Sequence, residues 1–376
     1  MLDLLVLRYL LMNKDLKYWL GLSKIQGVGA VRFRKLYNYF DSMQSAWQAS
    51  FSDFKQAGLE DAVAQSIIGE RKNIDLDEEV EKLIKENIKV VTALDNDYPK
   101  LLKEIYSPPG LLYYKGNLVD AGDEFAIAVV GTRKFSAYGK QVTETITAEL
   151  VNQGVATVSG LALGIDSMVH DITIKNNGRT ISVLGSGLDK QSIYPSSNRY
   201  LAEKILATNG LLVSEYPPGT MPLQGHFPQR NRIIAGLAVA TLVIEAPASS
   251  GALITAKNAI EFNRDVLAIP GNIYNINAQG TNNLIKLGAK LVTSVEDILE
   301  MLNIKEVKEF ITTRKITPDS KEEEILINLL SAEPLHINNL IKMSKLDTAA
   351  VSSTIVLMEM KGKVKNLGNN MYVLGR

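Results

Sequence analysis

Short apolar runs, each ending in a turn of small or polar residues, recur along the middle of the chain. They are rich in β-branched residues, do not alternate with polar positions, and are mostly followed by stretches with helical spacing. Strands without alternation are buried on both faces, as in a parallel sheet with helices on either side. Residues 123–302 are therefore predicted to form an extended Rossmann-like, doubly wound α/β domain. Its strands are expected in FAIAVVG, GVATVSG, TISVLGSG, GLLVSEYP, ATLVIEAP and DVLAIPG.

Residues 1–80 have helical spacing without strand-like runs, which predicts a small helical domain of the SAM or helix–hairpin–helix type. Within it, residues 22–40 (LSKIQGVGAVRFRKLYNYF) predict two helices joined by a Gly-Val-Gly turn. Such a turn can offer free N–H groups to a DNA phosphate, and Arg32, Arg34 and Lys35 follow it. The glycines can equally serve only to allow a tight corner between helices. The sequence leaves both explanations open.

Two segments are predicted to connect domains. Residues 81–122 contain LDNDYPKLL and SPPGLLYYKGN, whose prolines and glycines indicate irregular chain that covers the edge of the α/β domain and leads into it. Residues 303–320 are charged and predict a linker.

Residues 321–376 show three helical stretches and a terminal hairpin, the order of a winged helix. The third stretch, DTAAVSSTIVLMEMKG, contains acidic residues and no arginine, whereas reading a major groove needs Arg, Lys, Asn or Gln. We therefore expect this domain to dock protein rather than read duplex DNA. Lys361, Lys363 and Lys365 near the wing are its candidate phosphate contacts.

Composition narrows the function classes. The 376 residues include 41 basic and 41 acidic side chains, so no bulk basic field attracts nucleic acid. The absence of cysteine excludes disulfides and thiolate sites, and three scattered histidines disfavour a metal centre. The apolar N-terminus MLDLLVLRYLLM is interrupted by Arg8 and predicts an amphipathic helix rather than a signal peptide. No segment predicts a membrane span, so a cytoplasmic location is expected.

Glycine-rich turns and basic residues gather where the predicted parallel strands end. In such a sheet, ligands bind at the carboxyl ends of the strands. Glycines let an anion approach the backbone, and helix N-termini favour negative charge. Five such loops predict an anion-binding rim. They are VVGTRKFSAYG, SGLALGIDSMVH, GSGLDKQSIYP, SEYPPGTMPLQGHFPQRNRIIAGL and EAPASSGALITAKNA.

Individual residues of the rim have structural explanations as well. The guanidiniums of Arg230 and Arg232 can bind an internal carboxylate, the phosphate of a small ligand or a phosphate backbone, and Arg133 can pair with Glu215 or Asp166. Asp166 is expected to cap a helix, and His170 to be a packing residue on a helix face. The residues around Phe227 predict a loop, and an aromatic side chain among arginines suits base stacking beside phosphate contacts.

Sequence signatures of catalysis are missing. The first turn, GTRKFSAYG, lacks the glycine pattern of a dinucleotide site, and the later GSGLDK has Lys190 in place of the third glycine. Walker A, H-E-x-x-H and G-x-S-x-G motifs are absent, and no carboxylate pair or Ser/His/Asp set stands out. We therefore predict a binding protein with no catalytic residues, metal or cofactor.

The ordered motifs resemble those of the DNA-processing protein A (DprA, also Smf) family. Together with DYPKLL and PPGLLYYKGN they cover roughly residues 15–300, and the C-terminal winged helix fits the family architecture. The matching motifs are VVGTRKFSAYG, SGLALGID, GSGLDKQSIYPSSN, SEYPPG, FPQRNRIIAGL, EAPASSGALITA, IPGNI and GTNNLIKLGA.

This resemblance implies a dimeric protein that binds single-stranded DNA without reading sequence, protects it and hands it to the RecA recombinase during natural transformation. Ser196 stands where family members often have lysine, which removes one expected phosphate contact. Lys190 is a candidate replacement for that contact. Thr132, which precedes Arg133, is a further candidate contact. The strand-binding residues implied by the motifs are Arg133, Ser159, Gly160, Gly185, Ser186, Gly187, Phe227, Arg230, Asn231, Arg232, Ser250 and Gly251.

An alternative is a nucleotide-processing enzyme of the phosphoribohydrolase (lysine-decarboxylase-like) type, which shares the wider fold. Those enzymes carry P-G-G-x-G-T-x-x-E, whose acid serves the chemistry. The corresponding APASSGALITAKNAIE lacks both the double glycine and an acid near the turn, since Glu261 is far along the helix.

Overall fold

A computed structural model describes most of the chain and divides it into two compact units, Met1–Ile304 and Lys305–Arg376. The division falls within the predicted linker, residues 303–320. The predicted N-terminal amphipathic helix and most of that linker lie outside the described residues. Those described are 15–118, 121–302, 318–330, 335–361, 363–366 and 370–374.

The larger unit is built on a mostly parallel sheet. Its described strands have the order β1-β2-β6-β5-β4-β3-β7-β8-β9, and β3 to β9 run parallel. All six predicted strands are present as β3 to β8, and most of their side chains are buried on both faces. The strands are β1 (Lys89–Thr92), β2 (Leu111–Gly116), β3 (Ile127–Val130), β4 (Thr157–Ser159), β5 (Thr180–Val183), β6 (Leu211–Ser214), β7 (Ala240–Val243), β8 (Asp265–Ala268) and β9 (Lys290–Leu291).

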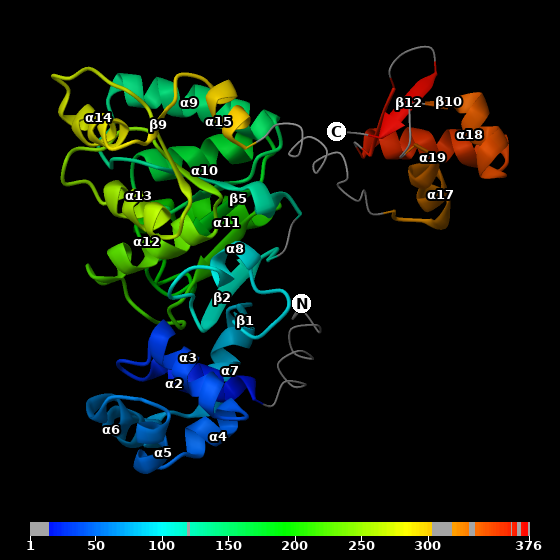
Figure 1. The fold of residues 1–376 in the computed structure, drawn as a ribbon. Coiled ribbons are helices and arrows are strands. Elements are labelled where there is room, and N and C mark those ends of the chain that lie inside the picture. Colours follow the sequence, from blue (N-terminus) through cyan, green and yellow to red (C-terminus); the bar gives the residue numbers. More distant parts are fainter. Residues whose placement is uncertain are drawn as a thin grey trace. The chain divides into compact units, whose positions relative to one another are not determined.

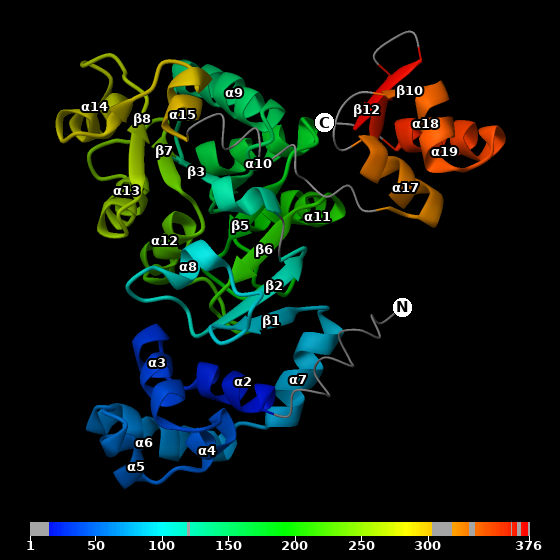
Figure 2. The same cartoon turned by 45° about the vertical axis from the view of Figure 1, so that its right-hand side comes forward.

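Helices cover both faces of this sheet, which confirms the doubly wound prediction. Helices α9, α10 and α11, which connect β3 to β6, lie together on one side of the sheet. Helices α12 and α13 lie on the other side (Figures 1 and 2). Strand β3 therefore lies at the topological switch point, between β4 and β7. The helices are η2 (Ala121–Phe125), α9 (Ala137–Asn152), α10 (Ile165–Lys175), η3 (Ser196–Asn198), α11 (Arg199–Ala207), α12 (His226–Gly236), α13 (Ala252–Glu261), η4 (Ile276–Ala278), α14 (Gln279–Lys286) and α15 (Val295–Met301).

The prediction of irregular chain over residues 81–122 is wrong in two respects. Helix α7 (Leu76–Lys85) runs across the predicted boundary at residue 80, and β1 and β2 add two antiparallel strands to the sheet. The short helix α8 (Lys100–Lys103) joins them. Neither strand alternates between buried and exposed positions, so no strand-like alternation marked them in the sequence.

The N-terminal part of the described chain is helical, as predicted. Gly27 has a φ of +89°, which favours glycine, and Gly29 donates to its carbonyl oxygen at 3.0 Å, so the turn is a tight corner. Arg32 donates to the same carbonyl and to Glu60, which favours the structural explanation of the motif. The helices before α7 are α2 (Leu16–Lys24), α3 (Ala30–Tyr39), α4 (Met43–Gln48), α5 (Phe51–Gln56), α6 (Asp61–Glu70) and η1 (Arg71–Asn73).

The smaller unit has the predicted winged-helix order and its own apolar core. Lys361 and Lys363 do not present free charges, because both pair with Asp319 and Glu323 at 2.5–3.0 Å. The side chain of Lys365 lies outside the described residues. The elements are α17 (Lys321–Leu330), β10 (Leu335–His336), α18 (Ile337–Ser344), α19 (Thr348–Met360), β11 (Val364–Asn366) and β12 (Met371–Leu374).

Candidate functional site

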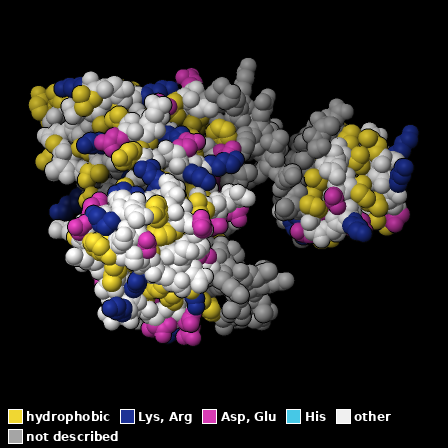
Figure 3. Space-filling model, turned by 60° about the horizontal axis from the view of Figure 1, so that its bottom comes forward, with side chains coloured by type: hydrophobic (Ala, Val, Ile, Leu, Met, Phe, Trp, Pro, Cys, Tyr) yellow, Lys and Arg dark blue, Asp and Glu magenta, His cyan; other side chains and the backbone are white. Residues whose placement is uncertain are grey.

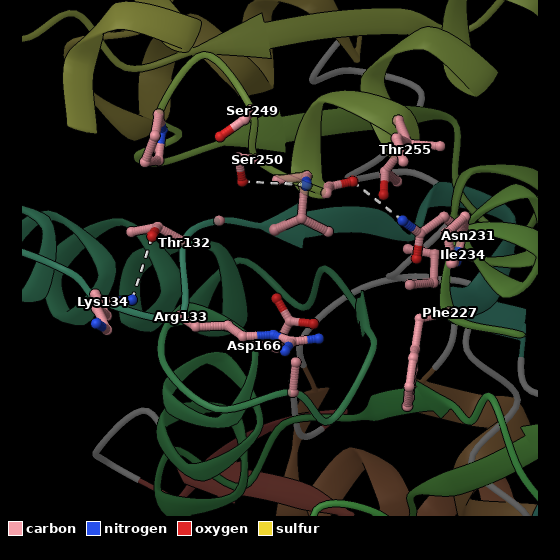
Figure 4. A pocket seen from close by; sticks show the side chains of 18 of the residues that line it. Thr132, Arg133, Lys134, Asp166, Phe227, Asn231, Ile234, Ser249, Ser250 and Thr255 are labelled. Atoms are coloured by element: carbon pink, nitrogen blue, oxygen red, sulfur yellow. Dashed lines mark hydrogen bonds between the residues drawn. The ribbon is translucent and has the colours of Figure 1, made fainter. Parts of the chain in front are cut away.

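The main pocket lies at the topological switch point. It is a cavity of about 630 Å³ between the loop after β3, the start of α12, the turn before α13 and the segment before α14. Figure 4 shows Arg133 and Phe227 on one side of this pocket and Ser249 and Ser250 on the opposite side. The predicted loops after β3, β4, β6 and β7 all contribute residues to this pocket, whereas the segment before α14 was not predicted.

Buried Glu245, at the end of β7, anchors the loop after β3. Its carboxylate accepts hydrogen bonds from the backbone N–H and the hydroxyl of Ser136, at 2.9 and 2.5 Å. Its carbonyl oxygen accepts from the N–H of Thr132 at 2.8 Å. Both ends of the short loop are thereby fixed, and Arg133 and Lys134 are exposed at its tip. Neither of these two side chains forms an ion pair within the described residues.

The N-terminus of α13 faces this basic tip. The preceding turn contains Ser249, Ser250 and Gly251, and the Ser250 hydroxyl accepts a hydrogen bond from Ala252 N–H at 3.3 Å. Asn231 on α12 donates to the Gly251 carbonyl at 3.1 Å, which ties the turn to the neighbouring helix. Hydroxyls, a helix N-terminus and two cations across one cavity form an arrangement that stabilises phosphate.

Arg230 holds the rim together from inside. It is 4% exposed, and its guanidinium donates to the carbonyl oxygens of Gly160, at 2.6 Å, and Val183. Burial lowers the pKa of Arg230 to about 10, opposed by the nearby carboxylate of Asp166. A Cβ on Gly160 would lie 2.7 Å from the guanidinium, so that glycine makes room for it. Arg230 therefore links the ends of β4 and β5 to α12.

Arg232 is neutralised by a carboxylate. It donates to Glu215 at 2.6 Å, and both side chains are less than one-fifth exposed. The resemblance implies that Arg230 and Arg232 both contact the strand, but Arg230 borders the pocket as a buried side chain and Arg232 pairs with an internal carboxylate, one of the alternatives considered for it. The free cations of the pocket are instead Arg133 and Lys134, and Arg133 pairs with neither of the acids considered for it.

Phe227 lies in the first turn of α12 rather than in a loop, and it is half-buried. Its ring packs 5.7 Å from that of Tyr194, between centroids, and the guanidinium carbons of Arg133 and Arg230 lie about 6 Å from its centroid. A Cβ on Gly185 would approach the ring to 3.1 Å, so this glycine provides space for the aromatic side chain. An aromatic face thus borders the cationic part of the pocket.

The loop after β5 does not open into the pocket. Gly185, Ser186 and Gly187 are buried, and Asp189 occupies the turn by accepting from Gly219 N–H at 2.7 Å. Lys190 is exposed but pairs with Glu203 at 2.9 Å. The carboxylate of Asp189 lies against this turn, since a Cβ on Gly187 would be 2.6 Å from it.

Three further residues considered in the sequence analysis are buried and interact within the fold. Ser159 is buried in β4, where its hydroxyl donates to the Val129 carbonyl at 2.8 Å. Asp166 does not cap its helix, since Gly164 is the N-cap; it accepts from Gly160 N–H at 3.1 Å, and burial raises its pKa. His170 is a buried packing residue, as predicted, and burial lowers its pKa to about 3.

Sequence reasoning missed Lys134, Glu245 and Asn277 as parts of the site. Asn277 donates to the Lys134 carbonyl at 2.8 Å and thereby joins the segment before α14 to the basic tip. The adjacent basic pair in GTRKF was the available signal for Lys134. Glu245 is an isolated acid at a strand end and Asn277 is one of several asparagines in its segment, so the sequence gave no signal for either of them.

The larger unit has no excess of positive charge, so an anion would be attracted only by local groups of basic residues. Basic and acidic side chains are interspersed over the face seen in Figure 3, and their numbers are equal over residues 124–300. Within the described ranges, no group of three or more His, Asp or Glu could hold a metal ion. No helix in those ranges is long and apolar enough to cross a membrane.

Comparison with known families decides the classification. The model of the DNA recombination-mediator protein A family matches residues 89–303, and that of the DprA winged helix domain matches residues 312–370. The chain belongs to the DNA recombination-mediator protein A family. Its relatives include protein Smf of Synechocystis, 42% identical over 82% of this chain and 78% of the relative, and DprA of Streptococcus pneumoniae, 48% identical over 55% and 72%.

Solved structures of DprA proteins have the same fold. That from Streptococcus pneumoniae aligns with a TM-score of 0.66 and 37% identity over 76% of this chain and 97% of that one. DprA from Helicobacter pylori aligns with a TM-score of 0.51 and 29% identity over 58% and 96%, and its structure concerns the single-stranded DNA binding mode of that protein. The family resemblance found in the sequence is therefore confirmed, and the phosphoribohydrolase alternative is not favoured.

Proposed function

We propose that the switch-point pocket binds single-stranded DNA without reading its sequence. The observation that carries this proposal is the pair of unpaired cations, Arg133 and Lys134, facing the N-terminus of α13 across an open cavity beside an aromatic ring. Phosphates are attracted to the first two features, and an unpaired base can stack on Phe227. In a duplex the bases are already paired and stacked, so this pocket favours the single strand.

Within this proposal the predicted residues take different roles. Thr132, Arg133, Phe227, Asn231, Ser250 and Gly251 line the pocket and contact the strand, together with Lys134. Arg230, Gly160 and Gly185 position those groups. The remaining predicted residues interact within the fold and are not proposed as DNA contacts. They are Ser159, Ser186, Gly187, Lys190 and Arg232.

Family membership supports a proposal for the wider role. We propose that the chain protects incoming single strands during natural transformation and transfers them to RecA, with no catalytic turnover, in the cytoplasm. We further propose that it acts as a homodimer, whose two pockets on one strand raise the avidity. Leu287 and Leu291, exposed beside the edge strand β9, support self-association.

A comparison of DNA forms tests the proposed function. We expect a 20-nucleotide oligo-dT to bind at least about tenfold more tightly than a 20-base-pair duplex, because only unpaired bases can stack in the pocket. A chain lacking residues 315–376 should retain this preference, because the proposed pocket lies wholly within the larger unit. Fluorescence anisotropy measures both affinities.

Two results would contradict the proposal. One is equal affinity for duplex and single strand. The other is loss of binding by the truncated chain while circular dichroism shows that its α/β fold is intact, which would place the DNA site on the winged helix.

A further inference from the structure

The loop between β8 and α14, residues 271–278, can be followed in Figure 2. It borders the pocket and carries exposed apolar side chains. Ile276 and Asn277 line the cavity. Tyr274, two residues before them, is 90% exposed, the largest fraction among the large apolar side chains of the described residues, and Ile273 is 75% exposed. An aromatic ring so fully in water is available to a ligand.

Hydrogen bonds from asparagine side chains hold this loop in place. The Asn282 carboxamide both donates to and accepts from the Gly271 backbone, at 2.9 and 3.1 Å. Asn272 accepts from Tyr274 N–H at 2.9 Å, and Asn275 accepts from Asn277 N–H at 3.0 Å. The exposed ring is therefore presented by a fixed backbone, which lowers the entropy cost of binding to it.

The same loop is fastened to the basic tip of the pocket. Asn277 donates to the Lys134 carbonyl, and its own carbonyl accepts from Ala246 N–H at 2.7 Å. No charged residue occurs between Asp265 and Lys286, so the loop neither attracts nor repels phosphate. An uncharged aromatic surface continuous with a cationic rim suits the base of a nucleotide whose phosphate lies at that rim.

We propose that Tyr274, flanked by Ile273, is a second base-stacking site for the strand held in the pocket. This inference rests on the proposed function, because it assigns the ring to a neighbouring nucleotide of the same single-stranded DNA. Phe227 stacks a base within the pocket, and Tyr274 stacks one outside it. The ligand is a nucleobase of any identity, since every base has a π-face.

Substitution of Tyr274 tests the inference. Loss of one base–aromatic stack should weaken binding of a 20-nucleotide oligo-dT by about 5- to 30-fold in Tyr274→Ala, whereas Tyr274→Phe retains the affinity. Tyr200→Ala is the matched control, because Tyr200 on α11 is 67% exposed and lines neither the pocket nor the loop. In Tyr274→Trp, binding of the 20-nucleotide oligo-dT should quench the fluorescence of the new indole, measured against the wild-type tryptophan background.

Other outcomes overturn the inference. Unchanged affinity of Tyr274→Ala, or unaltered indole fluorescence of Tyr274→Trp while oligo-dT binds, would remove Tyr274 from the DNA path and leave the pocket proposal standing. A change in sedimentation of Tyr274→Ala without DNA would assign the loop to a second copy of the chain. Failure of the wild-type chain to bind oligo-dT would instead refute the proposed function itself.

Discussion

Arg230→Leu is expected to destabilise the larger unit by about 2–6 kcal/mol, because two buried carbonyl oxygens lose their charged donor and each unsatisfied buried acceptor costs about 1–3 kcal/mol. The substitution leaves the carbonyl oxygens of Gly160 and Val183 without their donor and the buried carboxylate of Asp166 without a neighbouring positive charge. Affinity for oligo-dT should fall as well, because the ends of β4 and β5 lose their link to α12. Urea unfolding followed by circular dichroism measures the stability change.

Arg232→Leu is the matched control for this substitution. Its ion pair with Glu215 is less buried than the Arg230 guanidinium, at 19% and 15% exposure against 4%, so the loss of stability should be smaller than for Arg230→Leu. If Arg230→Leu unfolded like the wild type and yet bound DNA more weakly, Arg230 would be a DNA contact rather than the positioning residue described above.

The second large effect is expected at the tip of the loop after β3. Arg133→Ala should weaken oligo-dT binding about tenfold or more, since it removes a charge-assisted contact to phosphate. The combined Arg133→Ala and Lys134→Ala variant should also lower the slope of log affinity against log salt by about 1.4, equivalent to two phosphate contacts on a single strand. Both side chains are exposed, so the fold should be unaffected.

A salt titration of the wild type, the double variant and Lys175→Ala separates local contacts from general charge effects. Lys175 is exposed at the end of α10 remote from the pocket. An equal reduction of the slope by Lys175→Ala would mean that attraction is spread over the surface.

The central fold was predictable from the sequence because buried parallel strands leave continuous apolar runs such as FAIAVVG and ATLVIEAP. Strand β2 was missed because it lies between Pro108-Pro109-Gly110 and Gly116, so local turn signals outweighed it, and β1 because it directly follows the helical stretch of α7 and precedes LDNDYP.

The position of the site was predictable from strand ends, whereas the roles of its arginines were not. In the sequence Arg230 and Arg232 are separated only by Asn231, but the folded chain brings Arg230 to the ends of β4 and β5 and Arg232 to Glu215. The Gly185–Gly187 turn has the residues of an anion site, but it is buried, and the nearby Asp189 carboxylate accepts from Gly219 N–H in the loop after β6. Exposure is a property of the packed chain, and it decides which cations remain free.

Mapping of the bound strand tests the central claim most directly. An oligo-dT carrying 5-bromouracil is bound to the full chain and the complex is irradiated. The crosslinked peptides are then identified by mass spectrometry. The pocket model predicts crosslinks to the peptides that contain Arg133, Phe227 and Ser250. Crosslinks confined to residues 318–374, with none in those peptides, would contradict it.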